Sequence, residues 1–425
     1  MHDQSLTIPP ASEGKQNISC RQIVKWNELN LSPIKINTVN QPALGTSMKI
    51  CMLASTHGPN DGRIFQKEAK SLAKEHEVTI IAPSDGSGSS VADGISIVTV
   101  KRPDSVALHP LTLLRLFRAC LAQDADVYHC HEPDALLIGV LAKYLKGKRV
   151  VYDIHEHWPS EIPYDLGIRN GTLVQRALSA LVSSVEIALA RRAESTFAVS
   201  ESVAARFREK GIDPAIISNY SIADLDIPYN PVRSGRKLMF VAGNIHAFHG
   251  VGECIRAVSR VKEDYPDVTL TLVGNVREDL DEHINGSDHN EFITSTGFLP
   301  YREMYEKLNE GTAGLLVFQP TYYNISIGLP NKLFDYMLLG LPVIASDLPE
   351  IRNVVGKADC GILVDPVSVD EIADAITYLF EHPEEAQRMG ANGRKAVLER
   401  YNWSAMEADL LQIYRNLDDA RSRSA

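Results

Sequence analysis

The sequence predicts an α/β protein built from two doubly wound parallel sheets that face each other across a cleft. Two observations lead to this fold class: two successive series of strand-like runs that alternate with helix-like segments, and a polar, proline-punctuated stretch between the series. Alternating strands and helices are typical of parallel sheets covered on both faces. The 425 residues, 44% hydrophobic and 23% charged, suit an ordinary protein of two or more domains.

The first series begins at Met48. Residues 49–55 (KICMLAS) are expected to form a buried strand, residues 65–76 an amphipathic helix and residues 77–83 the next strand. Further strands are predicted at residues 95–100, 126–131, 148–155 and 195–200. Residues 48–222 are therefore expected to be an N-terminal Rossmann-like domain. Residues 1–47, rich in Ser, Asn, Gln and Pro, are expected to be a poorly ordered extension.

The second series follows a predicted linker at residues 223–236. Its strands are expected at residues 237–243, 268–275, 292–297, 313–318, 341–346 and 361–365. Residues 237–402 are thus predicted to be a C-terminal Rossmann-like domain, followed by a helix and tail at 403–425 whose packing partner periodicity does not give. Two such domains form a cleft between the carboxyl ends of their strands, where these folds bind ligands.

Composition narrows the function classes. The net charge of -11 argues against a general nucleic-acid binder. The six cysteines are scattered singly, so neither a disulfide framework nor a zinc site is indicated and a reducing cytoplasm is expected. No apolar run is judged long enough to cross a bilayer. The chain is therefore predicted to be cytoplasmic, with a place at the inner face of the membrane left open.

The stretch GLPNKLFDYMLLGLPVIAS, residues 328–346, predicts a short helix that opens with Pro330 and stops at Gly340. Its apolar stripe accounts for the packing but not for Asp335, which falls between apolar positions and is expected to be sheltered. A sheltered carboxylate needs a hydrogen-bonding partner. A ligand rich in hydroxyl groups would supply one.

This stretch, the opening STHGPNDGRIFQKEAKSLAKEHEVTIIAP and the two-part organisation resemble the GT-B glycosyltransferases of the group-1 (GT4) family, from Met48 to about Leu417. The similarity is greatest to bacterial members that build cell-surface polysaccharides. The resemblance implies retaining, metal-independent transfer from a nucleotide-diphosphate sugar, with a UDP-sugar favoured, to a saccharide or lipid-linked acceptor. It implies no other cofactor.

The resemblance also implies a donor site. Free N–H groups at the start of the helix, with the charge of Lys332, suit a diphosphate, and Asp335 would accept from ribose hydroxyls. Backbone contacts to the base are expected near Phe298 and Leu299. The residues assigned to the donor side in this way are Gly58, Arg63, Gly243, Asn244, His249, Phe298, Leu299, Gly328, Leu329, Asn331, Lys332 and Asp335.

Four positions depart from the family pattern, and one of them is Asp335, where most relatives carry the longer Glu. Where relatives carry an Arg and a Lys that clamp the donor phosphates, the loop GNIHAFHG has Asn244 and His249. A further glutamate of the relatives is replaced by Ile327. The leaving diphosphate would then rely on protonated His249, helix dipoles or Lys332. These departures keep two alternatives open: a non-catalytic GT-B partner or regulator, and a sugar-nucleotide epimerase or hydrolase.

Two strand ends of the N-terminal half carry the predicted catalytic side. His155 follows a buried strand and matches the family's catalytic-pocket histidine, where it can position a hydroxyl or share its proton; His157 is its neighbour and competitor. His131 and Glu132 resemble the His-Glu-Pro element on the acceptor side. The pair His129 and His131 has no third ligand at suitable spacing, so no metal site is expected.

Two helix-like segments, residues 111–122 and 172–192, combine apolar faces with arginines. Such helices lie on anionic membranes, which would suit a lipid-linked acceptor, yet packing helices with snorkelling Arg have the same pattern. Both interpretations stay open. The arginines are Arg115, Arg118, Arg176, Arg191 and Arg192.

Overall fold

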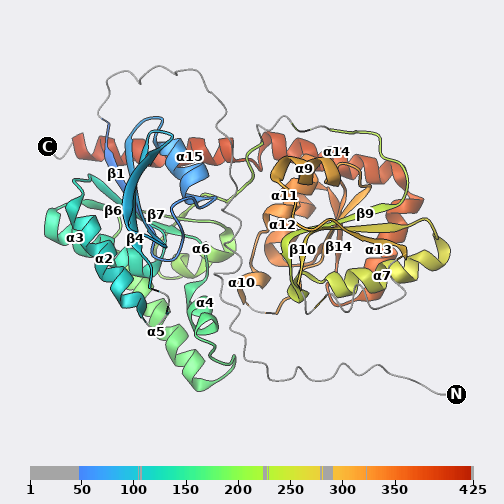
Figure 1. Cartoon of the computed structure of the whole chain (residues 1–425), viewed down its shortest axis with the longest axis horizontal. Helices are drawn as coiled ribbons and strands as arrows, with labels where there is room; N and C mark the ends of the chain where they lie inside the picture. Colours follow the sequence, from blue (N-terminus) through green and yellow to red (C-terminus); the bar gives the residue numbers. More distant parts are fainter. Residues whose placement is uncertain are drawn as a thin grey trace.

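The computed structural model describes residues 47–103, 105, 108–223, 227, 229–277, 280, 291–321 and 323–422. These residues form two α/β units, each built around its own sheet (Figure 1). The predicted fold class is confirmed. The predicted extension lies outside the described residues except for Ser47.

The N-terminal sheet has eight strands in the order β3-β4-β2-β1-β5-β6-β7-β8. Its strands are β1 (Lys49–Leu53), β2 (Glu77–Ser84), β3 (Gly88–Ala92), β4 (Ile95–Lys101), β5 (Val127–Cys130), β6 (Arg149–Ile154), β7 (Ser195–Ala198) and β8 (Ala215–Ile216). All neighbours pair in parallel except β3 and β4. The antiparallel edge strand was not predicted, although the Asp93-Gly94 pair that joins β3 to β4, both with positive φ, is a typical two-residue hairpin turn.

Helices cover both faces of this sheet. They are α1 (Lys70–Leu72), α2 (His109–Ala122), α3 (Pro133–Lys146), α4 (Trp158–Asp165), α5 (Leu173–Ala190) and α6 (Glu201–Arg208). The single helix predicted at 65–76 is instead a π-helix, η2 (Ile64–Ala69), continued by α1. The wider π-helical turn is marked by a hydrogen bond that the Glu68 N–H donates to the Arg63 carbonyl at 2.9 Å. The side chains of Arg63 and Glu68 are both buried in the core.

The C-terminal sheet has six parallel strands in the order β11-β10-β9-β12-β13-β14. The strands are β9 (Lys237–Ile245), β10 (Thr269–Val276), β11 (Ile293–Ser295), β12 (Ala313–Leu316), β13 (Val343–Ser346) and β14 (Gly361–Val364). The helices are α7 (Val251–Asp264), α9 (Tyr301–Leu308), α10 (Tyr323–Ser326), α11 (Asn331–Leu338), α12 (Pro349–Ala358), α13 (Val369–Glu381) and α14 (Pro383–Glu399). Strand β9 runs two residues beyond its predicted end, so Asn244 pairs with Asn275 instead of lying in a loop.

The last helix, α15 (Trp403–Ser422), leaves the C-terminal unit and packs on the N-terminal sheet (Figure 1). Leu410 and Leu411 join the core cluster of β1 and β2. The hydroxyl group of Tyr414 lies 2.9 Å from Nδ1 of His129, and the indole N–H of Trp403 donates to Ser71 Oγ at 2.9 Å. Helix α15, whose packing partner the sequence did not predict, thus packs on the N-terminal domain.

Contacts between the units lie beside the cleft. The side-chain oxygen of Asn324 in α10 accepts from the backbone N–H of His157 at 3.0 Å, and its amide N–H donates to Glu161 in α4. The N–H of Ser202 in α6 donates to Glu350 in α12 at 2.7 Å. These bonds hold the carboxyl ends of the two sheets face to face.

Helix α5 is long enough and apolar enough to cross a membrane, judged by length and composition, and only 17% of it is buried. The expectation that no apolar run has this length was therefore wrong. The cause is that α5 contains just two charged side chains, Arg176 and the buried Glu186.

The first prediction concerns α15. Leu410→Ala removes a fully buried side chain from the interface between α15 and the N-terminal sheet, and should lower the free energy of unfolding by about 2–4 kcal/mol. Asp409→Ala, at an exposed neighbouring position, should change it by less than about 0.5 kcal/mol. Chemical denaturation of both variants checks this, and equal stability of the two would contradict the packing of α15.

Candidate functional site

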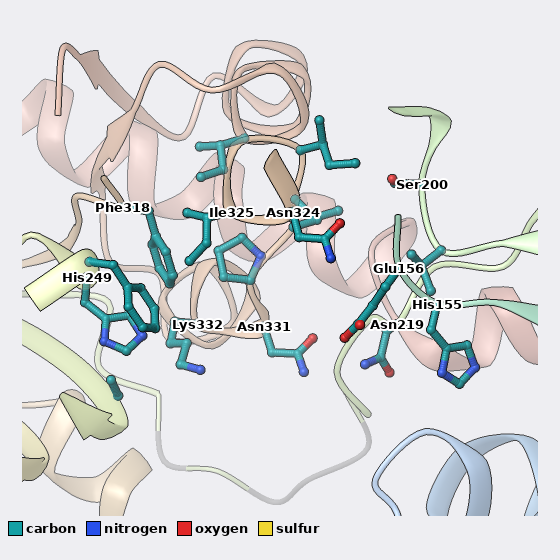
Figure 2. Close-up of a pocket in the computed structure, with 18 of the residues that line it drawn as sticks. His155, Glu156, Ser200, Asn219, His249, Phe318, Asn324, Ile325, Asn331 and Lys332 are labelled. Carbon is teal, nitrogen blue, oxygen red and sulfur yellow. The ribbon is translucent and has the colours of Figure 1, made fainter. Parts of the chain in front are cut away.

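A cavity of about 390 Å³ lies between the carboxyl ends of the two sheets (Figure 2). Its size is ordinary for a small-molecule site. Of the predicted site residues, the following line it: His155 from the N-terminal unit, and Gly243, Asn244, His249, Gly328, Leu329, Asn331 and Lys332 from the C-terminal unit. Residues from the ends of β6 and β9 and from the start of α11 thus line one cavity.

The N-terminus of α11 opens into this cavity. Pro330 precedes the helix, and no side chain caps the N–H groups of the first turn. Lys332 stands in that turn and lines the cavity (Figure 2). Burial lowers the pKa of Lys332, while the nearby Asp335 carboxyl group acts in the opposite direction. A helix N-terminus that has no side-chain cap and carries a lysine in its first turn is an arrangement suited to bind an anion.

His249 does not supply a second cation. Its Nδ1 accepts a hydrogen bond from the backbone N–H of His246 at 3.0 Å. Burial, and after it the charge of Lys332, lowers the pKa of His249 to about 2. Of the three groups expected to hold the diphosphate, the helix N-terminus and Lys332 are thus favoured over His249, because burial and the neighbouring ammonium group both disfavour the charged imidazole.

Asp335 finds its partners inside the protein. Its Oδ1 accepts from the Tyr305 hydroxyl at 2.6 Å and from Ser221 Oγ at 3.4 Å. Asp335 is buried and absent from the cavity lining, and burial raises its pKa. The expectation that this sheltered carboxyl group has a hydrogen-bonding partner is confirmed, and in this structure the partners are two protein hydroxyl groups.

His155 is held by Asp153, which precedes it by two residues on β6. Nε2 of His155 lies in hydrogen-bond contact with Asp153 Oδ2 and 3.2 Å from Nδ1 of His131. Burial lowers the pKa of His155, opposed by Asp153. A neutral imidazole whose Nε2 is bound to a carboxylate keeps Nδ1 for a substrate hydroxyl.

Behind His155 lies a fully buried polar cluster. The ligand-type atoms of Glu68, His129, His131 and Asp153 all lie within 4.8 Å of one another. The argument that the two histidines lack further ligands was wrong, since η2 and β6 bring carboxylates from distant parts of the chain. A cation is already present there. The Arg63 guanidinium lies 2.8 Å from Oε1 of Glu68. It also donates two hydrogen bonds to Asp153, from Nε to Oδ2 at 2.9 Å and from Nη2 to Oδ1 at 2.8 Å.

This cluster changes the interpretation of Arg63. The side chain is buried and does not line the cavity. Burial alone would raise the pKa of Asp153, but Arg63 and His155 hold it well below its usual range. Burial also raises the pKa of Glu68. Arg63 therefore neutralises Asp153, and Asp153 orients His155.

Glu132 also lies beneath the cavity surface. It accepts hydrogen bonds from the Ser55 N–H at 2.9 Å, from Thr56 Oγ1 at 2.9 Å and from His57 Nδ1 at 2.6 Å. Burial works against the charged imidazole, but the hydrogen bond and charge of Glu132 raise the pKa of His57 to about 10. Glu132 thus fixes the loop after β1 as one half of an ion pair.

Comparison with known proteins decides the family. The model "Glycosyl transferases group 1" matches residues 224–396, and "Glycosyl transferase 4-like domain" matches residues 62–219. The chain belongs to the group-1 glycosyltransferases. The predicted family is confirmed, and the two matches fall on the two α/β units.

Relatives of this glycosyltransferase span nearly its whole length. The phosphatidyl-myo-inositol mannosyltransferase of Mycolicibacterium smegmatis is 25% identical over 353 residues, which cover 81% of this chain and 86% of the relative. Sucrose-phosphate synthase from Thermosynechococcus elongatus superposes with a TM-score of 0.70 at 16% identity, covering 88% and 100% of the chains. HepE of Anabaena, solved with UDP, superposes with a TM-score of 0.65 at 17% identity. The superposition covers 88% of this chain and 100% of HepE. These likenesses confirm the GT-B fold.

The other predicted site residues of the glycosyltransferase do not line the cavity. His131 is fully buried, and the ring of His157 contacts Tyr323 with centroids 4.6 Å apart. The Phe298 N–H donates to Asn275 at 3.1 Å. The predicted residues outside the lining are Gly58, Arg63, His131, Glu132, His157, Phe298, Leu299 and Asp335.

Several lining residues of the glycosyltransferase were missed. Glu156 adjoins His155, and Ser200 follows β7 within two residues, so the strand-end argument could have found both. Asn324 comes from α10, a short helix with no apolar periodicity to predict it. The polar and aromatic lining residues that were missed are Glu156, Ser200, Asn219, Tyr220, His246, Phe248, Phe318, Asn324 and Phe334.

The second prediction uses the ion pair of His57 and Glu132. Because the pKa of His57 is about 10 in the folded protein and 6.5 in the reference state, its stabilisation is present in full below pH 6.5 and is lost as pH rises through about 10. His57→Gln should therefore destabilise the protein by roughly 2 kcal/mol at pH 6.5 and by much less at pH 10. Denaturant titrations at pH 6.5, 8 and 10 measure this, with the exposed His382→Gln as control; a pH-independent difference would contradict it.

Proposed function

We propose that this glycosyltransferase moves a sugar from a nucleotide-diphosphate sugar, with UDP-sugars favoured, to a saccharide or lipid-linked acceptor in cell-surface glycan synthesis. The observation that carries the proposal is the cavity in which the α11 N-terminus and Lys332 face His155 across the two domains. The relatives agree in kind: HepE was solved with UDP and with UDP-glucose, and the mycobacterial relative is named for mannosyl transfer to a phosphatidyl-myo-inositol.

In this proposal the diphosphate of the donor binds at the start of α11. Among the described residues that line the cavity, Lys332 is the one Lys or Arg, while Asn244 and His249 are neutral. Charge that develops on the leaving diphosphate would be stabilised by Lys332 and by the N–H groups of the first helical turn. This assignment requires no metal ion, and metal independence is part of the proposal.

Retention is proposed by a front-face route. The bond from the anomeric carbon to the diphosphate oxygen breaks, and the acceptor oxygen bonds to the same face of an oxocarbenium-like transition state. The acceptor proton passes to the departing diphosphate, so no protein nucleophile is needed. His155, held by Asp153, would position the acceptor hydroxyl through Nδ1.

The third prediction tests the donor site. Isothermal titration of UDP, GDP and ADP should find one nucleotide that binds the wild type, with an affinity at least tenfold lower in Lys332→Ala because a buried charge-assisted contact is lost. Lys357→Ala, on the exposed side of α12, should bind like the wild type. Asp335 is a poorer probe, since its substitution also breaks the contact with Tyr305.

The outcome also separates the competing functions. A nucleotide that binds, followed by transfer of its sugar to an acceptor, supports the transferase. Release of free sugar without an acceptor would favour a hydrolase. No binding of any nucleotide at millimolar concentration would overturn the proposal and favour a non-catalytic GT-B partner, consistent with a neutral Asn244 and His249.

We further propose that the enzyme works in the cytoplasm and docks on an anionic membrane through α2, α3 and α5. These helices pack side by side over one face of the N-terminal sheet. Their outer surfaces expose large apolar side chains: Leu111, Leu114, Leu137, Leu141, Tyr144, Leu145, Leu173, Val174, Leu181 and Val185. An exposed apolar surface of this extent is typical of a binding surface.

Charge favours a membrane as the occupant. The three helices carry five basic residues and two acidic ones, of which Glu186 is fully buried, whereas the whole chain has a net charge of -11. The basic residues are Arg115, Arg118, Lys143, Lys146 and Arg176, and Arg191 and Arg192 follow α5 directly. An apolar surface with basic side chains around it suits anionic lipid, which would bring a lipid-linked acceptor to the cleft.

The fourth prediction tests this surface. The wild type should float with vesicles of phosphatidylcholine and phosphatidylglycerol, less so with phosphatidylcholine alone and less at high salt. Leu145→Glu combined with Leu181→Glu should reduce binding at least tenfold, because two carboxylates enter the apolar surface. Leu398→Glu, exposed on α14 of the other domain, is the control. Unchanged binding of the double variant would contradict the proposal.

A further inference from the structure

Glu156 is the one acidic residue among the described residues that line the cavity. It follows His155 at the carboxyl end of β6, and its side chain is half-buried. In Figure 2 its carboxyl group points into the cavity, on the wall opposite Lys332, with Asn331 on the facing side. The cavity therefore has one potential cation on one wall and one acid on the other.

The carboxyl group of Glu156 has no hydrogen bond or ion pair with the part of the chain that the structure describes. Groups that act on it are Glu161 and Asp165 of α4, Glu132, and the imidazole of His57. Burial and the charge of Glu161 raise its pKa to about 8, although His57 opposes the shift. This environment favours the protonated, uncharged form of the carboxyl group near neutral pH.

A neutral acid suits a particular part of the donor. An ionised carboxylate in this cavity would repel a diphosphate, whereas the protonated form does not. A carboxylic acid donates one hydrogen bond and accepts others, which matches a sugar hydroxyl that also does both. Because Lys332 takes the charged end of the ligand, the acid on the opposite wall is left for its uncharged, hydroxyl-rich end.

We propose that Glu156 binds a hydroxyl group of the sugar to be transferred and helps to determine which sugar nucleotide is accepted. This inference rests on the proposed donor site and deepens it, since Glu156 would recognise the sugar while α11 and Lys332 hold the diphosphate. Glu156 is thereby a specificity-determining residue. The group that a protonated Glu156 would bind is a hydroxyl group, since a hydroxyl group can donate and accept a hydrogen bond at the same time.

The test compares each nucleoside diphosphate with its sugar derivatives. Dissociation constants of UDP, UDP-glucose, UDP-galactose, UDP-N-acetylglucosamine, GDP and GDP-mannose are measured at pH 7 for the wild type, Glu156→Ala and Glu156→Gln. Glu209→Ala, exposed on the same domain, is the control. The quantity of interest is the ratio of the constant of the nucleotide to that of its sugar derivative.

At least one sugar nucleotide should bind the wild type more tightly than its parent nucleotide. Glu156→Ala should reduce this ratio about tenfold, the change expected for one hydrogen bond of a desolvated group. Glu156→Gln keeps a donor and an acceptor and should retain the ratio within about threefold. The inference is overturned if no sugar nucleotide gains affinity over its parent, or if the gain persists in Glu156→Ala.

A pH series adds a second readout. Above pH 8 the ionised Glu156 should weaken the binding of the parent nucleotide to the wild type by repulsion, and this decline should be smaller in Glu156→Gln. An equal decline in both proteins would contradict the protonated state. If no nucleotide binds the wild type at all, the proposed function itself fails, which is distinct from a nucleotide that binds without a role for Glu156.

Discussion

The buried ion pair of Arg63 and Asp153 is the interaction on which the functional half of the N-terminal domain depends. It joins η2 to β6 across the carboxyl ends of β1, β5 and β6. Asp153 also contacts His155, so the position of the imidazole at the cavity follows from the position of the guanidinium below it. A charge buried without its partner is costly, so the loss of either residue alone is expected to destabilise the fold as well as the site.

The cavity itself is built with few charges. Lys332 stands at the start of α11, Glu156 lies opposite, and the imidazoles of His155 and His249 have lowered pKa values because they are desolvated. Such a site stabilises an anion mainly through a helix N-terminus and one ammonium group. No Lys or Arg other than Lys332 is among the described lining residues, so no basic side chain from elsewhere in them replaces the Arg and Lys that the family resemblance implies at Asn244 and His249.

The C-terminal side of the site was predictable from the sequence. The start of α11 and the end of β9 were predicted to face the cleft, and Gly328, Asn331, Lys332 and Asn244 do line the cavity. The sequence-based prediction was less accurate in the N-terminal half. Arg63 and Glu132 follow the same strand-end rule as His155, yet both are engaged by neighbours below the surface, because the rule gives the edge of the sheet and not the direction of a side chain.

The sequence by itself determined the two α/β series, the family and the helix that opens into the cavity, since these depend on local periodicity and on motifs contiguous in the chain. Only the tertiary structure decided the partners of the polar side chains. Arg63 meets Asp153 across 90 positions, and Tyr414 meets His129 across 285. Such pairs form because packing of distant elements brings buried polar groups together, and each must then find a partner from a different part of the chain.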